Sequence, residues 1–319
     1  MRGTAPSRSA GRRLRSVAAL VRFALAAALA LLAAGPALAG GIGFSLRFTG
    51  SGLDAPGLDR VEVPIDPHVP ADVGAGDFTV EWWMKALPGA NTTSGVCTPG
   101  GFNWIQGNIL LDRDVFGPGD RGDWGVSLWT GVIAFGVGGT SDDTVCGTTE
   151  IDDGAWHHVA ATRRASDGRL ELYVDGVLEA QGTGPAGDAS YRDGRPTPWP
   201  KDPFLVLGTE KHDVQHTPFA GWLDELRLST VRRYTASFTP PSAPFTPDGA
   251  TAALYRFDEG SGTAVLDASG AAGGPSHGVR LVGGDPPGPV YSADTPFAEV
   301  VFADGFESGD TSAWSAVIG

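Results

Sequence analysis

The stretch that most constrains the fold is residues 152–180, DDGAWHHVAATRRASDGRLELYVDGVLEA. Residues 156–164 alternate, and in residues 169–174 the apolar side chains occupy every second position, which is the period of a half-buried β-strand. Asp175 and Gly176 follow between apolar residues. An Asp-Gly pair in this setting predicts a two-residue hairpin, because both turn positions need a positive φ. The stretch therefore predicts three strands joined by tight turns.

The rest of the chain continues this pattern. Its 319 residues include 47 glycines and 24 prolines, and beyond the N-terminus no stretch keeps a helical period. Short alternating runs separated by turn residues predict an all-β fold, an antiparallel sandwich of two sheets. The further strands are expected at residues 44–48, 61–63, 77–85, 108–111, 124–129, 132–137, 204–208, 219–229 and 252–257.

The N-terminus is typical of a secretory signal peptide over residues 1–39. Six arginines precede an apolar run at residues 23–34, and Ala37-Leu38-Ala39 matches an A-x-A cleavage site. No later stretch is apolar enough to cross a bilayer. We therefore expect an exported protein, extracellular or at the cell surface, without a transmembrane segment.

The charge of the mature chain argues against nucleic acid binding. Removing the six leader arginines from the 23 basic residues leaves 17 against 37 acidic ones, a net charge of −20. Such a surface repels phosphate backbones. It suits divalent cations or neutral ligands such as sugars, and it also keeps an exported protein soluble.

Both cysteines, Cys97 and Cys146, lie in the mature part. An even pair in an exported chain indicates a disulfide bond. In the chain-entropy model, closing a loop of this length contributes roughly 3–4 kcal/mol. The alternative, a catalytic thiol, lacks a neighbouring base in the sequence.

Five segments occur in the order of a known family. They are SLRFTGSGLDAPGLDRVEVP (45–64), FTVEWWMKA (78–86), AWHHVAATRRASDGRLELYVDGVLEA (155–180), FLVLGTE (204–210) and FAGWLDELRLSTVRRY (219–234). Together they resemble the laminin-G-like, concanavalin A-like jelly-roll domains of bacterial exported proteins. The resemblance implies a jelly roll over residues 40–298 with its core at 44–234.

The C-terminal part allows two interpretations. Residues 253–278 resemble the opening strand and loop of the same family, which normally precede the first strand of the domain. They are either a truncated second repeat or a closing strand at 252–257, and we favour the strand because an uncovered sheet edge is a liability. Residues 301–315 resemble a C-terminal motif of exported bacterial proteins, so residues 299–319 are interpreted as a tail.

Two Gly- and Pro-rich insertions, 95–107 and 184–203, interrupt the strands and carry aromatic residues. Binding residues often lie on loops, and sugar rings stack on flat aromatic side chains. The alternative is that these rings only fasten their own loops to the sandwich. The expected ligand-binding residues are Trp104, Trp199 and Tyr191, with Asn103, Gln106 and Arg192 as polar partners.

The resemblance also implies calcium, since members of the wider fold often carry it at an edge of the sandwich. Asp54 and Asp59 in the first loop and Asp224 on a late strand are the candidate ligands. An acidic residue that is usual in the family is Thr49 here. The alternatives are a turn residue for Asp54 and, for Asp224, a buried carboxylate that accepts backbone hydrogen bonds.

The histidines do not indicate a metal site by their spacing. His157 and His158 are adjacent on a strand and diverge, and His212 and His216 lie four apart without a helical pattern.

Catalysis is not predicted. Glycosidases on this architecture use paired carboxyl groups, and on one strand only positions i and i+2 share a face. The pattern Glu-x-Asp-x-x-Glu is absent, and the adjacent Asp224 and Glu225 diverge unless the strand bulges there. The sequence thus predicts a non-catalytic module that binds a glycan or a surface protein. The competing functions are a glycoside hydrolase or lyase, and a purely structural module.

Overall fold

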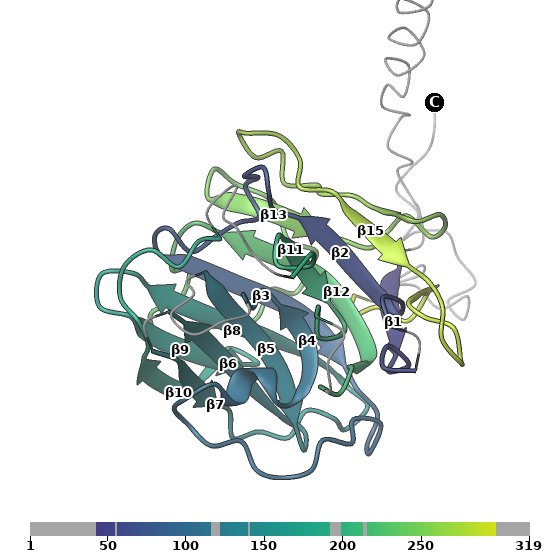
Figure 1. Cartoon of the computed structure of the whole chain (residues 1–319), viewed down its shortest axis with the longest axis horizontal. Coiled ribbons are helices and arrows are strands. Elements are labelled where there is room, and N and C mark those ends of the chain that lie inside the picture. The colour runs from purple at the N-terminus through teal and green to yellow at the C-terminus, as the bar shows by residue number, and fades with distance from the viewer. Residues whose placement is uncertain are drawn as a thin grey trace, which may run out of the picture. The chain divides into compact units, whose positions relative to one another are not determined.

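The computed structural model describes residues 43–54, 56–115, 122–139, 141–191, 199–212 and 216–297 (Figure 1). All of them belong to one compact unit, Ile42–Gly319. Across these residues the regular structure is almost entirely β-strand, with a single short 3₁₀ helix, η1 (Asn103–Ile105). None of the helical structure described here is long and apolar enough to cross a membrane.

The strands form two antiparallel sheets, so the predicted fold class is confirmed. The first sheet has the order β10-β9-β8-β3-β12-β1-β16, with β13 also paired to β12. Its strands are β1 (Ser45–Thr49), β3 (Phe78–Lys85), β8 (Trp156–Arg164), β9 (Arg169–Val174), β10 (Val177–Thr183), β12 (Ala220–Ser229), β13 (Thr251–Tyr255) and β16 (Val290–Ser292).

The second sheet has the order β14-β15-β2-β11-β4-β5-β6-β7. Its strands are β2 (Arg60–Pro64), β4 (Asn108–Asp112), β5 (Asp123–Trp129), β6 (Val132–Gly138), β7 (Asp143–Cys146), β11 (Phe204–Leu207), β14 (Ala264–Val265) and β15 (Gly278–Leu281).

The stretch at 152–180 forms three consecutive antiparallel strands, β8, β9 and β10, as its alternation predicts. The turn between β9 and β10 has φ 47° at Asp175 and 76° at Gly176. Both φ values are positive, as expected for an Asp-Gly pair in a two-residue hairpin turn.

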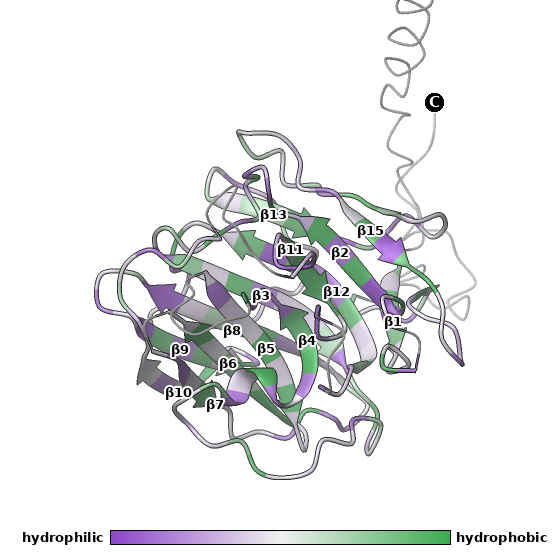
Figure 2. Cartoon of the chain, viewed as in Figure 1, coloured by the Kyte–Doolittle hydropathy of each residue, from purple (hydrophilic) through white to green (hydrophobic). Residues whose placement is uncertain are grey.

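One hydrophobic core fills the space between the sheets. On β3 the alternate residues Val80, Trp82 and Met84 point into it, and Val126 and Leu128 of β5 meet them from the second sheet. Apolar residues accordingly follow the strands of both sheets (Figure 2). The intervening residues of each strand therefore face outward, where loops cover part of them.

The C-terminal part adds strands to both sheets. β13 pairs with the second half of β12 (Leu226 opposite Tyr255), next to β1, which pairs with the first half of the same edge. β15 extends the second sheet beside β2 (Figure 1), and β16 pairs with β1 and extends the first sheet. The segment expected to close the sandwich thus lies within the first sheet.

The connection between β12 and β13, residues 230–250, covers the outer face of the first sheet; we call it the strap. Its rings of Tyr234, Phe238 and Phe245 each meet the fully buried His158 edge to face, at 5.7–6.5 Å between centroids. The Tyr234 hydroxyl donates to Glu81 Oε2 at 2.7 Å. The outer face at this point is therefore occupied by the chain itself.

Candidate functional site

The first insertion packs against the second sheet. Trp104 lies in η1 with a side chain that is 2% exposed, over Gly125 of β5 and Gly136 of β6. A Cβ on Gly125 would come within 2.6 Å of Cζ3 of the indole, and one on Gly136 would come closer still. The ring therefore fastens its own loop to the sheet, and its faces are not open to a sugar.

The other predicted ligand residues are spread over different environments. Tyr191 is fully buried in the main core, and the partly buried Trp199 meets the His212 ring edge to face at 5.6 Å. Asn103 donates its amide hydrogens to backbone carbonyls within the insertion, and Gln106 is exposed. Arg192 lies outside the described residues. The structure does not gather these side chains on one surface.

The predicted disulfide is formed. Cys97 in the first insertion is bonded to Cys146 at the end of β7. Together with Trp104, it holds the insertion over β5, β6 and β7.

The predicted calcium ligands do not fit a common site. Both carboxylate oxygens of Asp59 accept hydrogen bonds. The donors are the backbone amides and the side-chain hydroxyls of Thr49 and Ser51. Thr49 pairs with Ala220, whereas Asp224 follows Leu223, which pairs with Leu46 at the other end of β1. Three residues along a strand span roughly 10 Å. The exposed Asp54 caps a turn by donating its amide to Ser51.

β12 bulges at Asp224, so Asp224 and Glu225 escape the strict alternation of a strand. The pairing with β3 shifts between Asp224 and Arg227, and Glu225 has φ 48°. Burial, and then the charge of Glu225, raise the pKa of Asp224 to about 9. Glu225 pairs with Arg256 at 2.7 Å. Both carboxyl groups are buried, and neither lines the cavity described next.

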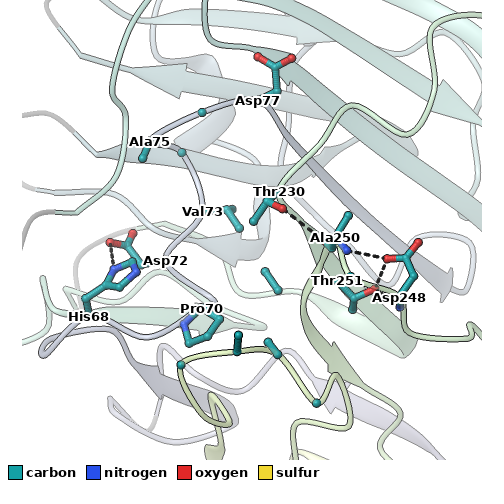
Figure 3. Close-up of a pocket in the computed structure, with 18 residues that line it drawn as sticks. His68, Pro70, Asp72, Val73, Ala75, Asp77, Thr230, Asp248, Ala250 and Thr251 are labelled. Carbon is teal, nitrogen blue, oxygen red and sulfur yellow. Dashed lines mark hydrogen bonds and ion pairs between the residues drawn. The ribbon is translucent and has the colours of Figure 1, made fainter.

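A cavity of about 630 Å³ opens where three distant segments meet (Figure 3). One wall is the loop between β2 and β3, the opposite wall is the turn into β13, and the loop between β14 and β15 completes it. Backbone and small side chains line most of it. The lining residues are His68, Pro70, Asp72–Asp77, Thr230, Asp248–Ala252 and Gly270–Gly273.

The polar groups of this cavity are held in place by the fold. The Asp248 carboxylate accepts hydrogen bonds from both terminal nitrogens of Arg233, at 2.7 and 2.9 Å, and from the Thr251 hydroxyl. The Arg233 bonds hold the pKa of Asp248 well below its usual range. Asp77 accepts a hydrogen bond from the amide of Ala165 at 2.8 Å. Figure 3 shows Asp77 and Asp248 on different walls.

A group of side chains that could hold a metal ion lies just beyond the C-terminal end of β4. Asp114, Glu210 and His212 place one ligand atom each within 4.8 Å of the others. Burial alone would lower the pKa of His212, but hydrogen bonds to Asp202 and Glu210 raise it to about 9. Burial and the neighbouring Asp112 raise the pKa of Asp114 to about 7. Within the described residues, this is the group whose composition suits a metal ion.

The model of one protein family, the concanavalin A-like lectin/glucanases superfamily in its laminin-G form, matches residues 61–236. The chain belongs to this family. No curated protein sequence matches it.

Solved structures similar to this laminin-G-like chain include a proposed carbohydrate-binding protein from Bacteroides ovatus, at 15% identity, 81% coverage of this chain, 62% of that chain and TM-score 0.47. Domains LG4-5 of the mouse laminin alpha1 chain are 17% identical, with 62% of this chain and 44% of that chain covered and a TM-score of 0.37. A pentraxin from Limulus polyphemus is 14% identical, with 63% of this chain and 80% of that chain covered and a TM-score of 0.37. The chain thus spans less than two thirds of the Bacteroides protein. These similarities are too remote to transfer a ligand or an activity.

The sequence analysis predicted neither the cavity nor the grouping of Asp114, Glu210 and His212 in this laminin-G-like domain. Glu210 and His212 lie two residues apart, and their side chains meet at 2.7 Å, but the backbone bends at residues 211 and 212. The alternation rule for strands therefore does not predict this contact. The position of Asp114 beside them depends on how the chain turns after β11, and nothing local indicates it.

Proposed function

We propose that the protein is an exported, non-catalytic module that binds a neutral glycan, or a glycan-bearing surface protein, in the cavity of Figure 3. The observation that carries this proposal is the cavity itself. Its volume of about 630 Å³ lies within the range of about 300–1,000 Å³ that small-ligand sites occupy. It is built by three segments that only the complete sandwich brings together.

The polar groups favour a ligand rich in hydroxyl groups. Asp77 and Asp248 line the cavity with carboxylate oxygens, which accept hydrogen bonds from hydroxyl groups, and the exposed Thr230 adds a hydroxyl of its own. The chain without its leader arginines carries 37 acidic against 17 basic residues, which disfavours anionic ligands. A neutral sugar meets both conditions.

The competing hydrolase function needs a carboxylic acid that is protonated near neutral pH. Asp248 is kept ionised by Arg233, which opposes such a role. Asp114, Asp123 and Asp224 have pKa values raised to about 7, 8 and 9, but none of the three lines the cavity. Calcium stays a prediction without an assigned site, because Asp54, Asp59 and Asp224 do not form one group.

A glycan array with and without chelator tests the proposal, using the wild-type chain and Ala75→Trp, which places a large ring in the cavity. Ala236→Trp is the matched control, because Ala236 is exposed on the strap outside the cavity. We expect binding to be lost in the first variant and kept in the second. Binding that survives Ala75→Trp would exclude this cavity, and release of shortened glycan would establish the hydrolase instead. Absence of binding by the wild type would favour the structural module.

A further inference from the structure

The group at the end of β4 is assembled by a reversal of the chain. After β11 the backbone turns at Gly208, with φ 93°, and the amide of Lys211 donates to Asp112 Oδ2 at 2.9 Å. This bond places residues 210–212 against the end of β4. Asp114 stands two residues beyond Asp112, so ligands from two separate segments converge.

The atoms that converge are one imidazole nitrogen and two carboxylate oxygens. His212 Nδ1 lies 2.7 Å from Glu210 Oε1 and 3.6 Å from Asp114 Oδ2. The side chains of His212 and Glu210 are 1% and 4% exposed, and that of Asp114 is 18% exposed. The site is thus closed on the histidine side and reachable from solvent at Asp114.

The orientation of the imidazole is fixed from behind. His212 Nε2 lies 2.6 Å from Oδ1 of the fully buried Asp202. This contact makes Nε2 the hydrogen-bond donor to Asp202 and leaves Nδ1 directed at Glu210 and Asp114. A carboxylate that holds the far nitrogen of a histidine is the arrangement that orients metal-binding histidines in proteins.

The lysine within the segment does not occupy the site. Lys211 Nζ donates to the backbone carbonyls of Asp202 and Phe204, at 3.0 and 3.1 Å. Its ammonium group is therefore engaged with main-chain oxygens, while the residues on either side of it face Asp114.

His157 also has carboxylate neighbours, but its contacts do not converge on one point that a metal ion could occupy. It lies between two carboxylates, with Nδ1 2.7 Å from Asp175 and Nε2 3.1 Å from Asp153. Each nitrogen there faces one carboxylate on its own side. Two oxygens and one nitrogen do not share a common centre, so His157 provides a matched comparison.

We propose that Asp114, Glu210 and His212 bind a first-row divalent metal ion, with Zn²⁺ as the best fit, and that Asp202 orients the histidine. A nitrogen and two carboxylate oxygens are ligands that zinc takes in proteins, whereas calcium takes six to eight oxygens.

The test is calorimetric titration of the purified chain, prepared without a histidine tag, with Zn²⁺ alone. We expect one equivalent to bind. Asp114→Asn and Asp202→Asn are each expected to weaken binding by about 10- to 100-fold or more. Asp153→Asn, beside His157, is expected to leave the affinity unchanged.

Melting curves without metal show whether each variant is folded. Asp114 is partly exposed, so Asp114→Asn stays informative if the buried Asp202→Asn does not fold. The proposal is overturned if the wild type binds no Zn²⁺, if Asp114→Asn binds as tightly as the wild type, or if Asp153→Asn loses as much affinity. Binding of Ca²⁺ in place of Zn²⁺ by the same residues would also overturn it.

Discussion

Gly125 and Gly136 stand directly opposite each other on β5 and β6. The pair leaves a flat area on the outer face of the second sheet, and the indole of Trp104 lies on it. Neither glycine has a positive φ, so what each position requires is the absence of a side chain. The Trp104 ring can therefore pack at this place only because both positions are glycine.

We expect Gly136→Ala to destabilise the protein by about 1–3 kcal/mol, which is typical of overpacking in a filled space. The added methyl group would overlap the Trp104 ring. Gly249→Ala is the control, because a Cβ there meets nothing within 4 Å; its effect should stay within about 0.5 kcal/mol. Urea denaturation measures both. Equal stabilities of the two variants would show that the ring shifts without cost.

The disulfide acts on the same insertion. Replacing Cys97 and Cys146 with serine opens a link across 49 residues. We expect a loss of about 2–4 kcal/mol, chiefly because the unfolded chain gains freedom. Denaturation of the double variant, beside the wild type with and without reductant, checks this. A midpoint that matches the oxidised wild type would mean that Trp104 and its contacts suffice to hold the loop.

The hairpin at 152–180 could be predicted because its signals are local. Alternation within each run specifies the strands, and Asp175-Gly176 specifies the turn between them. The two-sheet fold follows from many such runs. Each of these signals lies within about ten residues of the chain, so it can be recognised from a single sequence.

The environment of an aromatic residue in a loop is not local information. Trp104 and Tyr191 were expected to contact a ligand, and both rings are buried. The glycines beneath Trp104 lie more than twenty residues away, inside strands where glycine is unfavourable. Glycine in a strand signals a close approach, but it does not say by which side chain. His212 was missed similarly, since its neighbour Asp114 arrives through tertiary structure.

The strap over the first sheet contains a buried polar contact that should matter for stability. Tyr234 donates to Glu81, whose side chain is fully buried and also pairs with Arg227 at 2.8 Å. Removing the hydroxyl in Tyr234→Phe leaves the carboxylate with one donor fewer. Hydrogen bonds to charged groups contribute about 1.5–3 kcal/mol, so we expect a loss of that size in thermal or urea denaturation.

Tyr291→Phe is the matched control for the strap. Its hydroxyl also donates to a carboxylate, Glu259, at 3.1 Å, but both residues are partly exposed. Water can replace the lost donor there, so a change below about 1 kcal/mol is expected. If both variants lose the same amount, burial beneath the strap is not what strengthens the Glu81 contact.

The bulge at Asp224 predicts how stability varies with pH. Its pKa is raised to about 9 in the folded chain, first by burial and then by the charge of Glu225. An unfolded aspartic acid titrates near about 3.9. Between these values the folded state binds the proton and the unfolded state does not, so the stabilising contribution is complete below about pH 4 and declines as the pH rises toward 9.

Asp224→Asn removes this dependence, because an amide stays neutral and its oxygen can still accept the hydrogen bond from the Glu225 amide. The variant should therefore gain stability over the wild type as the pH rises. The gain should exceed about 1 kcal/mol at pH 8, since each unit of pKa shift corresponds to about 1.4 kcal/mol. Melting temperatures from pH 4 to 9 measure it, with Asp54→Asn on an exposed turn as control. A constant difference between Asp224→Asn and the wild type across this range would show that Asp224 is ionised in the folded protein.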